Sequence, residues 1–87
     1  MKNALSNTLL EIITALDFPE TEIVVQLPKN PEHGDFSTNL ALRLAGITGN
    51  KPQEIAQSIA RKLEEDYPNL VESASIAGPG FINISIN

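Results

Sequence analysis

The stretch LVESASIAGPGFINISIN, residues 70–87, decides what kind of fold this chain can form. Gly78, Pro79 and Gly80 break it in the middle, and apolar and polar residues alternate strictly after the break. Proline sets the φ that the first central position of a type II turn needs, and glycine accepts the positive φ of the second. The stretch therefore predicts two strands joined by a turn at Gly78–Gly80.

The second of these strands has two different faces. Because side chains alternate across a strand, Ile82, Ile84 and Ile86 share one face, which we expect in the core. Phe81 and Asn83 share the other, polar face. An aromatic ring can stack on an unpaired base while an amide bonds the base edge, but a lone aromatic at a sheet end more often packs on a neighbouring element. The pattern alone leaves both roles open and favours packing.

Three segments upstream have the periodicity of helices. Leucine and isoleucine recur with helical spacing over residues 3–16, and a stripe of leucine and alanine runs over 37–46. Residues 49–66 repeat an aliphatic side chain every four positions after Pro52, which suits a first helical turn. We therefore expect three helices.

The helix starts and one further strand follow from local signals. Ser37 is the expected cap of the second helix, with Asp35 as the alternative, and Asn50 with Gln53 resembles a capping box for the third. The short β-branched run EIVVQL, residues 22–27, predicts a strand.

These elements predict an α+β domain with about three helices packed on a small antiparallel sheet around a single core. The chain has 87 residues and is 41% hydrophobic, which suffices for one core but not for two. We therefore expect residues 1–87 to form a single domain. The alternation runs to the last residue without a terminal breaker, so we expect this domain to be cut from a larger protein.

Charge and composition narrow the classes of function. With a net charge of −5 and only six basic residues, the chain cannot draw general nucleic-acid affinity from counterion release. A base-specific contact stays open if another domain supplies the phosphate contacts. There is no cysteine, and polar residues interrupt the apolar run of residues 1–13. We expect a cytoplasmic protein without a disulfide, a signal peptide or a membrane partner.

The loop PEHGDF, residues 31–36, groups the carboxylates of Glu32 and Asp35 with His33. Acid–base chemistry or a metal would need a ligand spacing or a nucleophile that this loop lacks. We favour a structural role, in which Gly34 supplies a special backbone angle and Asp35 or His33 bonds loop amides or caps the next helix. We accordingly expect neither a catalytic residue nor a metal ligand in this chain.

Three ordered blocks together resemble the amino-terminal additional domain of arginyl-tRNA synthetase: PEHGDFSTNLALRLAG (31–46), KPQEIAQSIARKL (51–63) and IAGPGFIN (76–83). The likeness covers nearly the whole chain. It implies a domain that precedes a class I catalytic domain and contacts the D-loop of tRNA, while ATP and arginine bind elsewhere in the parent enzyme.

The resemblance also implies roles for particular residues. The aromatic and polar residues after the Gly-Pro-Gly element are the family's D-loop base contacts, and the matching positions here are Phe81 and Asn83. The HIGH and KMSKS-type signatures of class I catalysis are absent, so the chain itself is expected to be inactive and to need no cofactor. The parent would use ATP to attach arginine to its tRNA. The alternative is a protein-interaction or structural module with an open strand edge at its end.

Overall fold

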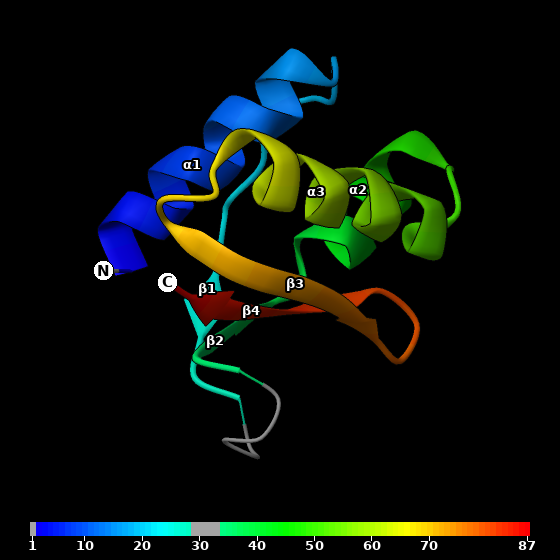
Figure 1. The fold of residues 1–87 in the computed structure, drawn as a ribbon. Helices are drawn as coiled ribbons and strands as arrows, with labels where there is room; N and C mark the ends of the chain where they lie inside the picture. Colours follow the sequence, from blue (N-terminus) through cyan, green and yellow to red (C-terminus); the bar gives the residue numbers. More distant parts are fainter. Residues whose placement is uncertain (1, 29–33) are drawn as a thin grey trace.

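The computed structural model describes residues 2–28 and 34–87, which form three helices on one face of a four-stranded sheet (Figure 1). The helices are α1 (Lys2–Ala15), α2 (Leu40–Thr48) and α3 (Pro52–Asp66). The strands are β1 (Val25–Gln26), β2 (Phe36–Thr38), β3 (Val71–Ala77) and β4 (Phe81–Ile86). The predicted α+β class, with helices on a small antiparallel sheet, is confirmed.

The sheet has the strand order β1-β2-β4-β3, and every neighbouring pair is antiparallel. The hairpin of β3 and β4 forms as the sequence predicts, with Ala77 opposite Phe81. β4 lies between β2 and β3, so the expectation that the last strand leaves an open edge is wrong. A strand with a partner on each side is held by two ladders, which fixes the direction of every side chain along it.

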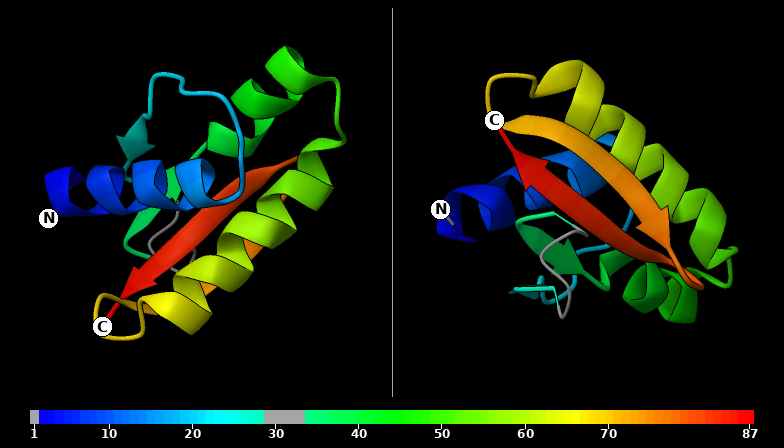
Figure 2. Two further views of the ribbon diagram at one scale, coloured as in Figure 1. Left: turned by 90° about the horizontal axis from the view of Figure 1, so that it is seen from above. Right: turned by 60° about the horizontal axis from the view of Figure 1, so that its bottom comes forward.

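One core lies between the helices and the covered face of the sheet, and the views in Figure 2 show the helices lying over the strands. Leucine and isoleucine side chains of the three helices form one core cluster with Ile82 and Ile84 of β4, and these two isoleucines are 0% exposed. The buried apolar residues are Leu5, Leu9, Ile12, Ile13, Val25, Leu40, Ala41, Leu44, Ile55, Ala56, Ile59, Ala60, Leu63, Val71, Ile82 and Ile84.

The start of the second helix differs from the prediction. Ser37 lies in β2, and α2 begins only at Leu40. The hydroxyl of Thr38 donates to the carbonyl of Val24 at 2.8 Å and accepts the N–H of Leu40 at 3.2 Å. Thr38 thus ties the β1 segment to β2 and satisfies an amide at the start of α2, a role predicted for Ser37 or Asp35.

The predicted capping box of α3 and the predicted length of the first strand are also wrong. The N-cap residue of α3 is Lys51, which makes no side-chain capping bond, so Asn50 and Gln53 do not form a capping box. In the run 22–27, only Val25 and Gln26 pair as a strand, because the neighbouring strand β2 is itself three residues long.

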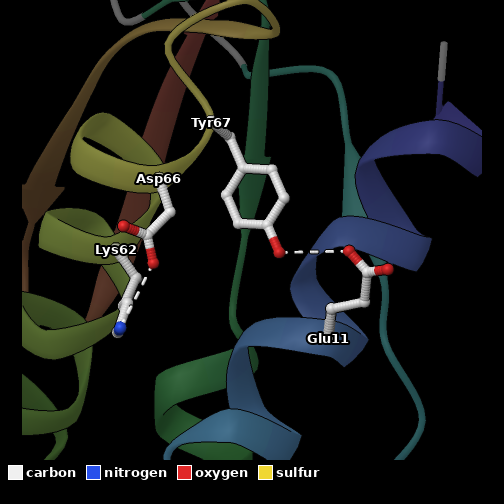
Figure 3. Close-up of polar contacts among 4 residues, drawn as sticks. All are labelled: Glu11, Lys62, Asp66 and Tyr67. Atoms are coloured by element: carbon white, nitrogen blue, oxygen red, sulfur yellow. Dashed lines mark hydrogen bonds and ion pairs between the residues drawn. The ribbon is translucent and has the colours of Figure 1, made fainter.

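A polar contact joins the end of α3 to α1. The hydroxyl of Tyr67, directly after α3, donates to Glu11 Oε1 on α1 at 3.0 Å (Figure 3). Near Tyr67, Lys62 Nζ lies 3.2 Å from Asp66 Oδ2, and both residues belong to α3. Burial and the hydrogen bond to Glu11 raise the pKa of Tyr67 above its ordinary value, so the protonated hydroxyl is the form that the fold favours.

Candidate nucleic-acid interface

The turn between β3 and β4 packs against the junction of α2 and α3. A Cβ built on Gly80 would lie 2.8 Å from Cβ of Pro52 and 3.4 Å from the side chain of Leu42, so only glycine fits there. The left-handed φ of 59° falls at Gly78, whereas Gly80 has φ 157°. A type II turn needs φ near +80° at Gly80, so the predicted turn type is wrong although the turn lies where expected.

Phe81 follows this turn directly as the first residue of β4. Its side chain projects from the face of the sheet opposite the helices, which we call the open face. Its side chain is 41% exposed, while the next residue, Ile82, is fully buried. A Cβ built on Gly78 would lie 4.0 Å from Cδ2 of Phe81, which places the ring beside the turn. The aromatic therefore presents much of its surface to solvent at the end of the central strand.

Asn83 lies on the same open face, two residues along β4 and about 7 Å from Phe81. The register places it opposite Ser37 of β2 and Ser75 of β3, and Ser37 in turn lies opposite Gln26 of β1. Partners across antiparallel strands project from the same face. Gln26, Ser37, Asn83 and Ser75 thus form one line across all four strands, which we call the polar row.

The sequence revealed only one member of the polar row. Ser37 was predicted to be a helix cap, and neither Gln26 nor Ser75 was singled out. The register of β2 against β4 brings them together, and this pairing joins segments far apart in the chain. The alternating serines 73 and 75 were the one local signal, because serine at every second position marks a solvated strand face.

Gly34 and Asp35 fix the far end of the open face. The N–H of Asp35 donates to the carbonyl of Ile84 at 2.9 Å, and Asp35 Oδ2 accepts the N–H of Ile86 at 2.8 Å. Gly34 has φ 106°, and a Cβ on it would lie 2.9 Å from the oxygen of Ile84 and 3.1 Å from Oγ of Ser85. This segment therefore lies against β4 at Ile84 and Ser85 and continues the ladder of β2.

Among the residues that the structure describes, the strand side chains that register and alternation assign to the open face carry no charge. The strand positions that project from it, as judged by register and alternation, are Gln26, Ser37, Ser73, Ser75, Ala77, Phe81, Asn83 and Ser85. The chain as a whole carries eleven acidic and six basic residues. These positions thus offer hydrogen-bonding groups and one aromatic ring, while the carboxylate of Asp35, at the far end of the face, accepts the N–H of Ile86.

The described residues form neither a metal-binding cluster nor a membrane-spanning helix. Among residues 2–28 and 34–87, no group of three or more His, Cys, Asp or Glu side chains is placed to hold a metal ion. No helix in these same ranges is long and apolar enough to cross a membrane. Glu32 and His33, weighed above for acid–base chemistry, lie outside the described residues.

Comparisons with known proteins give a consistent result. A family model described as the arginyl tRNA synthetase N terminal domain matches residues 1–86. Arginine–tRNA ligase of Salinibacter ruber is 43% identical over 86 residues, covering 95% of this chain and 15% of the relative. The ligase of Staphylococcus carnosus is 45% identical over 86 residues, covering 92% and 15%. The structure of Thermus thermophilus arginyl-tRNA synthetase superposes with a TM-score of 0.81 at 24% identity, covering 100% of this chain and 14% of that chain.

The fold is one that occurs within an aminoacyl-tRNA synthetase. The chain belongs to the family of arginyl-tRNA synthetase N-terminal domains, as the resemblance of its three sequence blocks implied. It spans about 15% of the length of the curated relatives it matches.

Proposed function

We propose that this chain is the tRNA-reading domain of an arginine–tRNA ligase and that it contacts the D-loop through Phe81 and Asn83. The observation that carries the proposal is an aromatic ring, 41% exposed, on the uncharged open face of the central strand β4, with an amide next to it on the same face. A core or packing role for Phe81 fits this exposure poorly.

The two side chains have complementary chemistry for an unpaired base. The ring of Phe81 offers a surface on which a base can stack, a contact worth about 1 to 3 kcal/mol. The amide of Asn83 offers one acceptor and two donor hydrogens, which distinguish the edge of one base from another. The separation of about 7 Å along the strand lets the two act on the same or on neighbouring nucleotides.

Because this domain is acidic, we propose that the rest of the parent enzyme contacts the phosphates of the tRNA. A domain with a net charge of −5 gains little from counterion release, so its contribution is recognition of a base rather than general affinity. In this proposal the domain lies within a longer chain whose class I catalytic domain binds ATP and arginine and transfers arginine to the tRNA. The domain itself takes no part in the chemistry, and its lack of cysteine suits the cytoplasm.

The alternative is a module that binds a protein partner by adding a strand to the sheet. The structure offers this alternative little support at β3, because Glu64 Oε2 accepts the N–H of Ala74 on that edge at 2.9 Å. The opposite edge strand, β1, is two residues long. Short edges and edges bonded by a side chain are devices that discourage strand addition.

The test is steady-state arginylation by the full-length parent carrying Phe81→Ala or Asn83→Ala. We expect the KM for tRNA to rise about tenfold in each variant, because each loses a base contact, with the KM for arginine and for ATP unchanged. Ile47→Ala, which truncates an exposed aliphatic side chain on α2, is the matched control for Phe81→Ala. Unaltered tRNA kinetics in both site variants would contradict the assignment.

A further inference from the structure

We propose that Ser37 and Ser75, the neighbours of Asn83 in the polar row, are two further RNA contacts, and that the D-loop crosses the sheet along this row. This inference rests on the proposed function and deepens it. It names the hydroxyls that would hold the sugar and base edge of the nucleotide that Asn83 reads.

The geometry of the sheet places the two hydroxyls at the amide. Ser37 and Ser75 are the direct register partners of Asn83, one on each side. Direct partners on one face of a sheet have Cβ atoms about 5 Å apart, so a nucleotide bound by Asn83 lies within reach of both serines. The polar row as a whole spans about 14 Å from β1 to β3, which is three strand spacings.

The segment at Gly34 limits the path that the RNA can take over the open face. Along β4, Gly34 approaches Ser85 so closely that a built Cβ would lie 3.1 Å from the serine Oγ. An RNA segment that stacks on Phe81 and reaches Asn83 therefore meets backbone if it continues along the strand. Across the strands it meets Ser75, which is exposed, on one side and Ser37 on the other.

The chemistry of the row fits ribose better than phosphate. A serine hydroxyl both donates and accepts, and so does the 2′-hydroxyl of RNA. The four side chains of the row are uncharged, so the row itself places neither a repelling carboxylate nor a phosphate-binding lysine against the RNA. Such a surface favours a single-stranded RNA loop over DNA and over a charged protein partner.

The experiment measures arginylation by the full-length parent with Ser37→Ala, Ser75→Ala and the double variant. Loss of one hydroxyl contact raises the KM for tRNA about three- to tenfold, and the double variant has the larger effect. The kcat and the KM for arginine stay unchanged. Ser75→Thr keeps the hydroxyl and restores the KM, which a purely structural loss would not explain. Ser58→Ala is the matched control, because Ser58 is exposed on α3 in the helical layer.

A second arm uses tRNA with 2′-deoxy nucleotides in the D-loop. On this substrate the parent with native serines loses affinity, and Ser75→Ala causes no further loss, because the contact it removes is already gone. An additional loss of the same size on the deoxy substrate would overturn the ribose contact.

The outcomes separate the two proposals. If Phe81→Ala and Asn83→Ala raise the KM for tRNA while both serine variants leave it unchanged, the polar-row inference fails and the proposed function stands. If all four variants leave it unchanged, both fail. A loss of affinity that accompanies a lower melting temperature and is not restored by Ser75→Thr also overturns the inference.

Discussion

The two faces of β4 are made by alternate residues of the same short segment, yet they do opposite things. Ile82 and Ile84 are fully buried under the helices, whereas Phe81 and Asn83 project from a face that carries no helix. The covered face holds the fold together through apolar burial. The open face contributes little to stability and is free to carry recognition, so substitutions on the two faces should separate stability from tRNA binding.

The largest expected effect comes from the covered face. Ile84→Ala leaves a cavity between the central strand and the helices and should lower the free energy of unfolding by about 3 to 4 kcal/mol. Its neighbour on the open face, Asn83→Ala, should change this free energy by less than about 0.5 kcal/mol. Urea denaturation of the two variants measures both values. Similar losses in the two would break the distinction between the faces.

A smaller effect is expected where the segment at Gly34 approaches β4. Gly34→Ala places a Cβ 2.9 Å from the carbonyl oxygen of Ile84 and strains a residue at φ 106°. It should cost about 2 kcal/mol, because the obstacle is backbone that cannot move aside.

The control for this change is Gly46→Ala, since nothing lies within 4 Å of a Cβ at that position of α2. The substitution should raise stability by about 0.5 kcal/mol, because alanine is the better helix former. Thermal denaturation distinguishes the two, and a stabilised Gly34→Ala variant would show that the segment does not approach β4 as described.

The smallest effect concerns the contact between Tyr67 and Glu11. Tyr67→Phe removes a hydrogen bond at the surface and should cost about 0.5 kcal/mol. The pKa of Tyr67 is raised in the folded protein above its ordinary value of 10.0, so its contribution is complete below that pH and is lost as the pH rises through the folded pKa. The stability difference between the native chain and the variant should therefore shrink in alkaline solution, and a difference that grows would contradict this account.

How far the sequence could predict this molecule depends on whether a feature is local. The helices and the β3–β4 hairpin follow from periodicity and from Gly78–Gly80, because each forms from residues close together in the chain. β2 could not be found in this way. Its three residues are too few to show alternation, and its pairing depends on β4, far along the chain. The error at Ser37 has this cause.

The residues of the candidate site also differ in whether a local sequence pattern could identify them. Phe81 and Asn83 stand out because alternation within one strand separates them from the isoleucines. Ser37 and Ser75 could not be assigned to the site, because only the register of three strands shows that they flank Asn83. A local pattern predicts which face a residue occupies, while its neighbours on that face are a property of the folded sheet.

If the open face of β4 reads a base, the full-length parent should discriminate among D-loop variants of its tRNA, and Asn83 should be required for this discrimination. Arginylation is compared for transcripts that carry each of the four bases at each unpaired D-loop position, with and without Asn83→Ala. We expect the native enzyme to prefer one base at one position, and we expect Asn83→Ala to abolish this preference while leaving arginine and ATP binding intact. A preference that survives the substitution would contradict it.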